Sequence, residues 1–318
     1  MRDHVMRVAI EAIEYYLPQR TEDGSVLVRD NPDWRIADIE RKTGVRTRHI
    51  ADPEQTVVEL AVGAAEQLFA SGVQRSEIDF LILVTQSPDY VLPTSACILQ
   101  DRLGLPRSCM AFDVNLGCSG FVYGLAIGGP LIEAGMANKG IIICSETYTK
   151  YIRKDDRTCR PLFSDGAAAT VIGSCSNDAL GPFEMGTDGS GATNLLVTAG
   201  QLHMEGAKVF QFTMDMVPRC VTALLERSRQ TVEDIDLFVF HQASQLVLEN
   251  VVRRLKLPEE KVFMNYQHIG NTVSASIPIA LKDAEDQHRL SRGDQVMLVG
   301  FGVGYSWGAC LVRWMRPV

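Results

Sequence analysis

Two stretches of the sequence decide the fold: Ile78-Asp79-Phe80-Leu81-Ile82-Leu83-Val84-Thr85-Gln86-Ser87 and Ile235-Asp236-Leu237-Phe238-Val239-Phe240-His241-Gln242-Ala243-Ser244. Each is a continuous apolar run that ends in polar residues, which is typical of a strand buried inside a parallel sheet. The second stretch begins 157 residues after the first (235 − 78 = 157), about half of the 318-residue chain. The sequence therefore indicates one structural unit used twice.

The segments around these strands repeat at nearly the same distance. A helical pattern precedes each strand, over residues 59–71 and 215–229. A second apolar strand pattern follows Gly135 and, 158 residues later, Gly293. Strands that alternate with helices favour an α/β fold with parallel central sheets covered by helices. The expected division is into two similar halves, residues 1–174 and 175–318.

The composition excludes several classes of protein. Hydrophobic residues make up 46% and charged residues 22% of the chain, which is typical of a folded globular protein. The formal net charge of −8 repels phosphate backbones, so we expect no nucleic-acid partner. No apolar stretch is long enough for a membrane span and no signal peptide is evident, so we expect a cytoplasmic protein. The eight cysteines form no C-x-x-C pair, which argues against disulfides and a metal site.

One cysteine has a distinctive context. The motif Gly117-Cys118-Ser119-Gly120-Phe121 follows a short apolar strand and opens an apolar helix. The free N–H groups and the dipole of a helix start favour an anion, so the position predicts a lowered thiol pKa and a nucleophilic thiolate near neutral pH. The alternative is a small buried residue that fills a tight helix contact, which is the commoner use of cysteine in apolar surroundings.

Three further motifs could supply partners for this thiol. His241 is the one histidine that directly follows a buried strand, where it is either a proton partner or a core residue with its hydrogen bonds satisfied. Asn271 is either a helix N-cap or an inward-pointing amide, and it lies 153 residues after Cys118 (271 − 118 = 153). The duplication therefore predicts that the two helix starts face each other. The glycine-rich run 300–308 precedes a strand pattern and offers either oxyanion-binding N–H groups or a simple turn.

Together these motifs resemble those of the thiolase-fold condensing enzymes, specifically the β-ketoacyl-acyl carrier protein synthase III family. The likeness covers nearly the whole chain and rests on the following segments: residues 43–50, 117–121, 163–168, 241–243, 270–272 and 302–308. It implies the thiolase fold, a five-layered αβαβα arrangement of two duplicated halves, and a homodimer.

The resemblance implies an activity: decarboxylative Claisen condensation of an acyl-CoA primer with a malonyl thioester, on acyl carrier protein or coenzyme A, to a 3-oxoacyl product. Cys118 would carry the acyl group, and His241 with Asn271 would hold the thioester carbonyl of the second substrate. The N–H groups of Cys118 and Val303 would form the oxyanion hole. The loop 300–304 lacks the second cysteine of thiolases, which favours decarboxylative chemistry, and no metal or cofactor is implied.

The resemblance also implies binding residues. The substrate pocket would include Leu92, Phe210, Gly302 and Gly304. Of these, Leu92 replaces an aromatic residue that shapes the partner subunit's acyl pocket. Coenzyme A or the carrier protein would contact Lys150, Arg153, Arg157, Arg253 and Arg254. The alternative for such basic residues is an ordinary solvated surface.

Two departures from the family leave other functions open. Leu246 stands where relatives carry an arginine that docks acyl carrier protein, and the stretch 26–42 is longer than usual. One alternative is transfer of the acyl group from Cys118 to a small alcohol or amine in a specialised pathway. The other is a partner subunit without catalytic activity.

Overall fold

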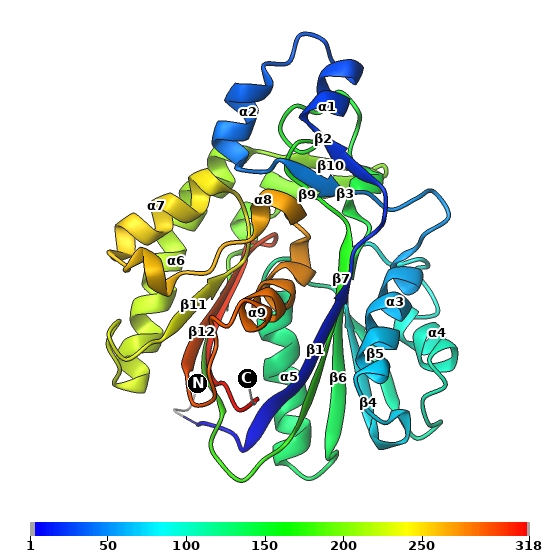
Figure 1. Cartoon of the computed structure of the whole chain (residues 1–318), viewed down its shortest axis with the longest axis vertical. Coiled ribbons are helices and arrows are strands. Elements are labelled where there is room, and N and C mark those ends of the chain that lie inside the picture. Colours follow the sequence, from blue (N-terminus) through cyan, green and yellow to red (C-terminus); the bar gives the residue numbers. More distant parts are fainter. Residues whose placement is uncertain (1–3, 317–318) are drawn as a thin grey trace.

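Two β-sheets form the framework of the protein, which a computed structural model describes over residues 4–316 (Figure 1). The first sheet contains β1 (Val8–Tyr16), β4 (Phe80–Val84), β5 (Met110–Val114), β6 (Lys139–Glu146) and β7 (Gly166–Ser174). The second contains β8 (Leu180–Thr187), β11 (Leu237–Phe240), β12 (Gln295–Gly302) and β13 (Ser306–Arg313). Their spatial orders are β1-β7-β6-β4-β5 and β11-β12-β13-β8. The proposed boundary between residues 174 and 175 lies in the connection between β7 and β8.

Both sheets are mixed. β4 pairs in parallel with β5 and β6, and β11 pairs in parallel with β12, as the apolar runs predict. The remaining pairs are antiparallel, so the expectation of parallel sheets is correct only for these three strand pairs. One reason is the short connection of residues 303–305 between β12 and β13, because a turn of this length can join only antiparallel neighbours.

Helices complete five layers (Figure 1). The helices α3 (Val57–Ala70) and α4 (Ser95–Arg102) cover the outer face of the first sheet, and α6 (Gly206–Ser228) and α7 (Gln245–Leu255) cover that of the second. Between the sheets lie α5 (Gly120–Glu133) and α9 (Ser276–Asp286), and each packs against both. The expected αβαβα order is confirmed.

The middle layer is the largest part of the core. Phe121 and Leu125 of α5 and Ile277 and Leu281 of α9 are fully buried there. α5 has apolar residues on nearly every side, and the first six residues of α9 are all buried, so both helices require cover from two sheets. Each begins at the same end of the molecule, and the site described below lies there.

Small elements lie at that end of the sheets (Figure 1). They are β2 (Thr21–Asp23), α1 (Gly24–Asp30), α2 (Ile36–Thr43), β3 (Thr47–His49), β9 (Leu195–Thr198), β10 (Gln201–Met204) and α8 (Tyr266–Ile269). Five 3-10 turns complete the described chain: η1 (Arg75–Glu77), η2 (Tyr148–Tyr151), η3 (Gly189–Asn194), η4 (Glu259–Lys261) and η5 (Val273–Ala275).

A buried ion network fixes the long segment around α1 and α2. Glu22 binds Arg48 at 2.6 Å and Arg160 at 3.3 Å, and Arg160 also binds Asp30 at 2.6 Å. Both guanidinium groups are buried, and despite the burial of Glu22 they hold the pKa of its carboxyl below the usual range. The network ties the segment to the loop that contains Arg160. No helix within residues 4–316 has the length and apolar character needed to cross a lipid bilayer.

Candidate active site

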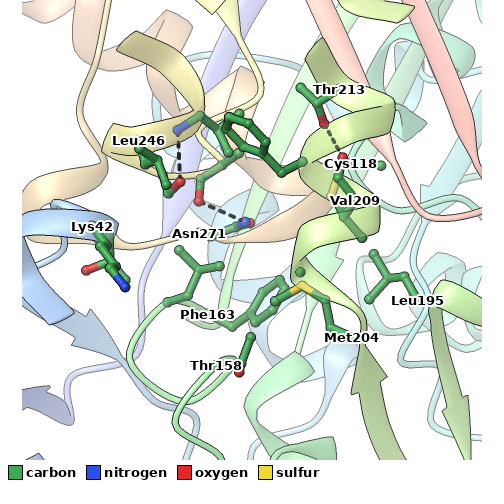
Figure 2. A pocket seen from close by; sticks show the side chains of 18 of the residues that line it. Lys42, Cys118, Thr158, Phe163, Leu195, Met204, Val209, Thr213, Leu246 and Asn271 are labelled. Atoms are coloured by element: carbon green, nitrogen blue, oxygen red, sulfur yellow. Dashed lines mark hydrogen bonds between the residues drawn. The ribbon is translucent and has the colours of Figure 1, made fainter. Parts of the chain in front are cut away.

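A pocket of about 710 Å³ opens where the two halves meet, and it contains Cys118, His241 and Asn271. The structure therefore brings the three residues singled out in the sequence into one cavity. Figure 2 shows Cys118 and Asn271 on opposite sides of a space that is otherwise mostly apolar. The apolar lining includes Leu162, Phe163, Leu195, Met204, Val209 and Phe210.

Cys118 lies in the turn between β5 and α5, two residues before the helix begins. Its neighbour Ser119 shares a 2.7 Å hydrogen bond with Ser306 of the second half, which fixes the turn across the interface. The end of β12 packs directly against Cys118. A Cβ atom at Gly302 would lie 2.9 Å from the Cβ and 3.0 Å from the Sγ of Cys118, so only glycine fits beside the thiol.

The protonation states of the thiol and the imidazole follow from burial. Burial raises the pKa of Cys118 to about 12, with the nearby Glu146 carboxyl as the second cause, and burial lowers the pKa of His241 to about 3. The prediction that the helix start lowers the thiol pKa is therefore wrong for the unliganded protein. The sulfur has lost its hydration, and this loss outweighs the favourable field of the helix. At neutral pH the pair is a thiol beside a neutral imidazole.

His241 directly follows β11, and its N–H donates to the carbonyl of Val299 at 2.8 Å. Its ring stands edge-on to Phe301, and its Nδ1 lies 2.7 Å from the Oγ of Ser276. The same Oγ accepts the N–H of Gln242 at 3.4 Å, so its own hydrogen is available for Nδ1. With Nδ1 as acceptor, the ring proton sits on Nε2 and faces the pocket.

Asn271 combines both functions considered for it in the sequence. Its Oδ1 accepts the N–H of Val273 at 2.9 Å and so holds the turn that follows it. Its Nδ2 donates to the carbonyl of Ala243 at 3.3 Å and lies 3.4 Å from Nε2 of His241. Two N–H donors from different segments are therefore adjacent, at a spacing that suits one shared oxygen acceptor.

The turn between β12 and β13 supplies further backbone groups. Val303 lines the pocket, and its carbonyl accepts the Ser306 hydroxyl at 2.8 Å. Within residues 4–316, the N–H groups of Val303 and Cys118 have no hydrogen-bond acceptor. Both are therefore available to a ligand.

The remaining pocket residues expected from the sequence divide into two groups. Phe210 of α6 and Gly302 line the cavity. Gly304 lies beyond the lining residues of the same turn, and Leu92 is 80% exposed on the loop after β4, away from the cavity of its own chain.

Of the five basic residues expected to bind coenzyme A or the carrier, only Arg157 lines the cavity. Lys150 donates to the carbonyls of Pro53 and Gln55, and Arg153 pairs with Asp155 at 3.1 Å. The other two lie on the last turn of α7, outside the cavity: Arg253 and Arg254.

Sequence reasoning missed two residues of the site. The first is Lys42 of α2, which lines the cavity together with Arg157. Leu246 lies close to Lys42 in Figure 2. Ser276 was also overlooked, although it stands only five residues after Asn271 at the start of α9. A hydroxyl at a helix start is so common a capping feature that its pairing with His241 gives no distinctive signal.

The comparisons with known proteins agree with this geometry. The family model "3-Oxoacyl-[acyl-carrier-protein (ACP)] synthase III" matches residues 112–189, and the model of its C-terminal part matches residues 225–314. The β-ketoacyl-[acyl-carrier-protein] synthase III of Natranaerobius thermophilus is 36% identical over 314 residues, covering 92% of this chain and 94% of that protein. This chain belongs to the 3-oxoacyl-[acyl-carrier-protein] synthase III family.

Solved structures of synthase III enzymes have the same architecture. A crystal structure of a 3-oxoacyl-(acyl-carrier-protein) synthase III is 43% identical, covers 97% of this chain and all of that chain, and superposes with a TM-score of 0.95. The priming β-ketosynthase of the R1128 polyketide pathway is 28% identical, with a TM-score of 0.92 and coverage of 100% and 99%. The thiolase-like fold that the family resemblance implied is thereby confirmed.

Proposed function

We propose that this enzyme loads an acyl group from acyl-CoA onto Cys118 and condenses it with malonyl-acyl carrier protein to 3-oxoacyl-acyl carrier protein and CO2. One observation carries the proposal. A buried thiol, an imidazole and a side-chain amide share a single cavity with two unbonded backbone N–H groups in a member of this family. Each group matches one requirement of acyl transfer followed by enolate formation.

The first step is acyl transfer to the thiol. Because the Cys118 thiol is protonated at rest, it must lose its proton as it attacks, and the neutral His241 ring is the available base. For this step the ring proton lies on Nδ1 and is donated to Ser276, so the resting ring first changes tautomer; Nε2 then takes the thiol proton and passes it to the departing coenzyme A thiolate. The tetrahedral oxyanion would be bound by the N–H groups of Cys118 and Val303, each typically worth about 3 kcal/mol.

The second step uses the other tautomer of the same ring. Ser276 donates to Nδ1, so that Nε2–H and the Nδ2–H of Asn271 both point at the thioester carbonyl of the malonyl group. When CO2 leaves, its bonding electrons form an enolate whose oxygen these donors stabilise. The enolate carbon attacks the acyl carbon on Cys118, the carbon–sulfur bond breaks, and the Cys118 thiolate takes one proton from solvent, which is the proton that the overall reaction consumes.

The pocket and its rim support further parts of the proposal. The apolar lining suits an acyl chain, and Lys42 and Arg157 at the cavity suit the phosphates of coenzyme A. We place Leu92 at the interface of a homodimer, because Val91 and Leu92 are 99% and 80% exposed on a free-standing loop. There Leu92 would contribute to the partner subunit's acyl pocket, and the reaction would take place in the cytoplasm.

Mass spectrometry tests the first step. The protein is incubated with acyl-CoA thioesters of different length, and the peptide that contains Cys118 is weighed. We expect an acyl adduct that is absent in Cys118→Ser and retained in Cys97→Ser, since Cys97 is exposed on α4. Absence of any adduct would instead favour a subunit without catalytic activity.

Release of CO2 tests the second step. Malonyl-acyl carrier protein is added to the acylated enzyme, and CO2 and the 3-oxoacyl product are measured. We expect one CO2 for each acyl group consumed. Transfer of the acyl group to an added alcohol or amine without CO2 release would contradict condensation and favour the alternative transferase.

A further inference from the structure

Glu146, the last residue of β6, is a completely buried carboxyl group that the steps above do not use. Residues 4–316 offer it no ion-pair partner, yet several groups donate hydrogen bonds to it. The donors are the Oγ of Ser274 (2.8 Å), the Oγ of Ser87 (2.8 Å), the N–H of Gln86 (3.1 Å) and the Oγ1 of Thr85 (3.4 Å). Burying a carboxylate is costly, and the hydrogen bonds from these donors offset part of that cost.

These donors come from both halves of the protein. Residues 85–87 follow β4 of the first sheet, whereas Ser274 belongs to η5 in the second half, which packs against β6. Ser274 lies on the same short segment as Asn271, which lines the pocket, and Ser276, which binds Nδ1 of the His241 ring. The Glu146 carboxylate is thus a direct link between the first sheet and the segment that orients the two side-chain donors.

The first-half partners of Glu146 also contact the turn that carries the thiol. The side chain of Gln86 lies over Gly117, where an added Cβ atom would be 2.4 Å from its Oε1. The hydroxyl of Tyr148, which lines the pocket, donates to the same Oε1 at 3.3 Å. Glu146 therefore bonds on one side to residues packed against the Cys118 turn and on the other side to the segment of Asn271.

We propose that Glu146 is a positioning residue for carbon–carbon bond formation. By joining Ser274 to the end of β4, it fixes the distance between Cys118 and the donor pair of His241 and Asn271. The inference rests on the proposed function. It concerns chiefly the condensing step, because acyl loading needs only Cys118 and His241, whereas condensation needs the acyl-bearing sulfur and both side-chain donors in one geometry.

The protonation of Glu146 offers a readout. Burial raises its pKa to about 7, although the hydrogen bonds it accepts lower it. The other titratable groups close to it are Cys118, Cys144, Tyr148 and Tyr151, and burial raises the pKa of each above its already high ordinary value. Of this group, only Glu146 titrates between pH 6 and 8. A protonated carboxyl accepts fewer hydrogen bonds, so the condensing step should weaken as the pH falls through about 7.

Two serine variants test the proposal as a matched pair. Ser274→Ala and Ser87→Ala each delete one hydroxyl that lies 2.8 Å from the same carboxylate, on opposite sides. The enzyme is first loaded from acyl-CoA, and a single turnover with malonyl-acyl carrier protein is then timed. We expect condensation to slow at least tenfold in Ser274→Ala and less than threefold in Ser87→Ala. Acyl loading should slow less than condensation in Ser274→Ala, because loading uses His241 without Asn271.

Glu146→Gln adds the pH readout. We expect it to slow condensation at least as much as Ser274→Ala and to flatten the pH dependence of that step between pH 6 and 8. Equal slowing in both serine variants, or normal condensation in Ser274→Ala, would overturn the inference. If Glu146→Gln does not fold, the serine pair alone decides. Failure of the wild-type enzyme to load or condense would instead contradict the proposed function.

Discussion

The unliganded Cys118 thiol should react slowly with a small alkylating reagent, and its reactivity should keep rising with pH. Burial raises its pKa from the ordinary 9.0 to about 12, which lowers the thiolate fraction at pH 8 about a thousandfold. A more basic thiolate is also a better nucleophile, which restores about 20-fold. The net expectation is alkylation about 50-fold slower than that of an ordinary exposed thiol, before any effect of access.

Iodoacetamide labelling followed by peptide mass spectrometry measures this rate between pH 6.5 and 10, with the exposed Cys97 of the same chain as internal control. Restricted access would slow Cys118 equally at every pH, so the shape of the profile isolates the pKa. The logarithm of the rate should rise by about one for each pH unit up to pH 10. A plateau below pH 8 would refute the reasoning. If such a plateau disappeared in His241→Ala, the His241 imidazolium would be shown to stabilise the Cys118 thiolate.

Three further changes have defined outcomes. Gly302→Ala should reduce acyl loading at least 100-fold and also lower the melting temperature, because the new methyl group lies 2.9 Å from the Cβ and 3.0 Å from the Sγ of Cys118. Normal loading in the mass assay would contradict this contact. Asn271→Asp keeps the oxygen that accepts the N–H of Val273 but loses the Nδ2 donor. CO2 release should therefore fall about 100-fold while acyl loading persists. Equal loss of acyl loading and CO2 release would contradict a role of this donor in the second step alone. Arg48→Met leaves Glu22 with two of its three arginine partners, Arg20 and Arg160, and should lower the free energy of unfolding in urea by about 1.5 to 3 kcal/mol. An unchanged midpoint would show that this ion pair adds no stability.

Much of the framework could be predicted because local patterns determine it. The helical pattern over residues 59–71 corresponds to α3 at Val57–Ala70, and the apolar run before Thr85 is β4. The pattern over residues 215–229 captured only the second part of α6, which begins at Gly206. Its first turns line the pocket, so their apolar residues do not follow the period of a helix that faces a sheet.

The site shows where sequence reasoning ends. The duplicated strands correctly brought Cys118 and Asn271 to facing positions, since the offset between the halves carries three-dimensional information. The sequence predicts a lowered pKa for the Cys118 thiol, whereas the pKa is raised. The burial that determines it comes partly from Gly302, which lies 184 positions along the chain (302 − 118 = 184). Contacts between such distant residues leave no local pattern, and the same is true of the pairing between Glu146 and Ser274.

The position of α5 and α9 between the two sheets limits how this enzyme can change during evolution. A substitution at a buried position of either helix disturbs two sheets at once, which leaves few positions free to accumulate neutral variation. The segments around α2, β9 and the start of α6 border the cavity from outside this layer. Selection for a different primer can therefore act on these segments while the reacting groups keep their geometry.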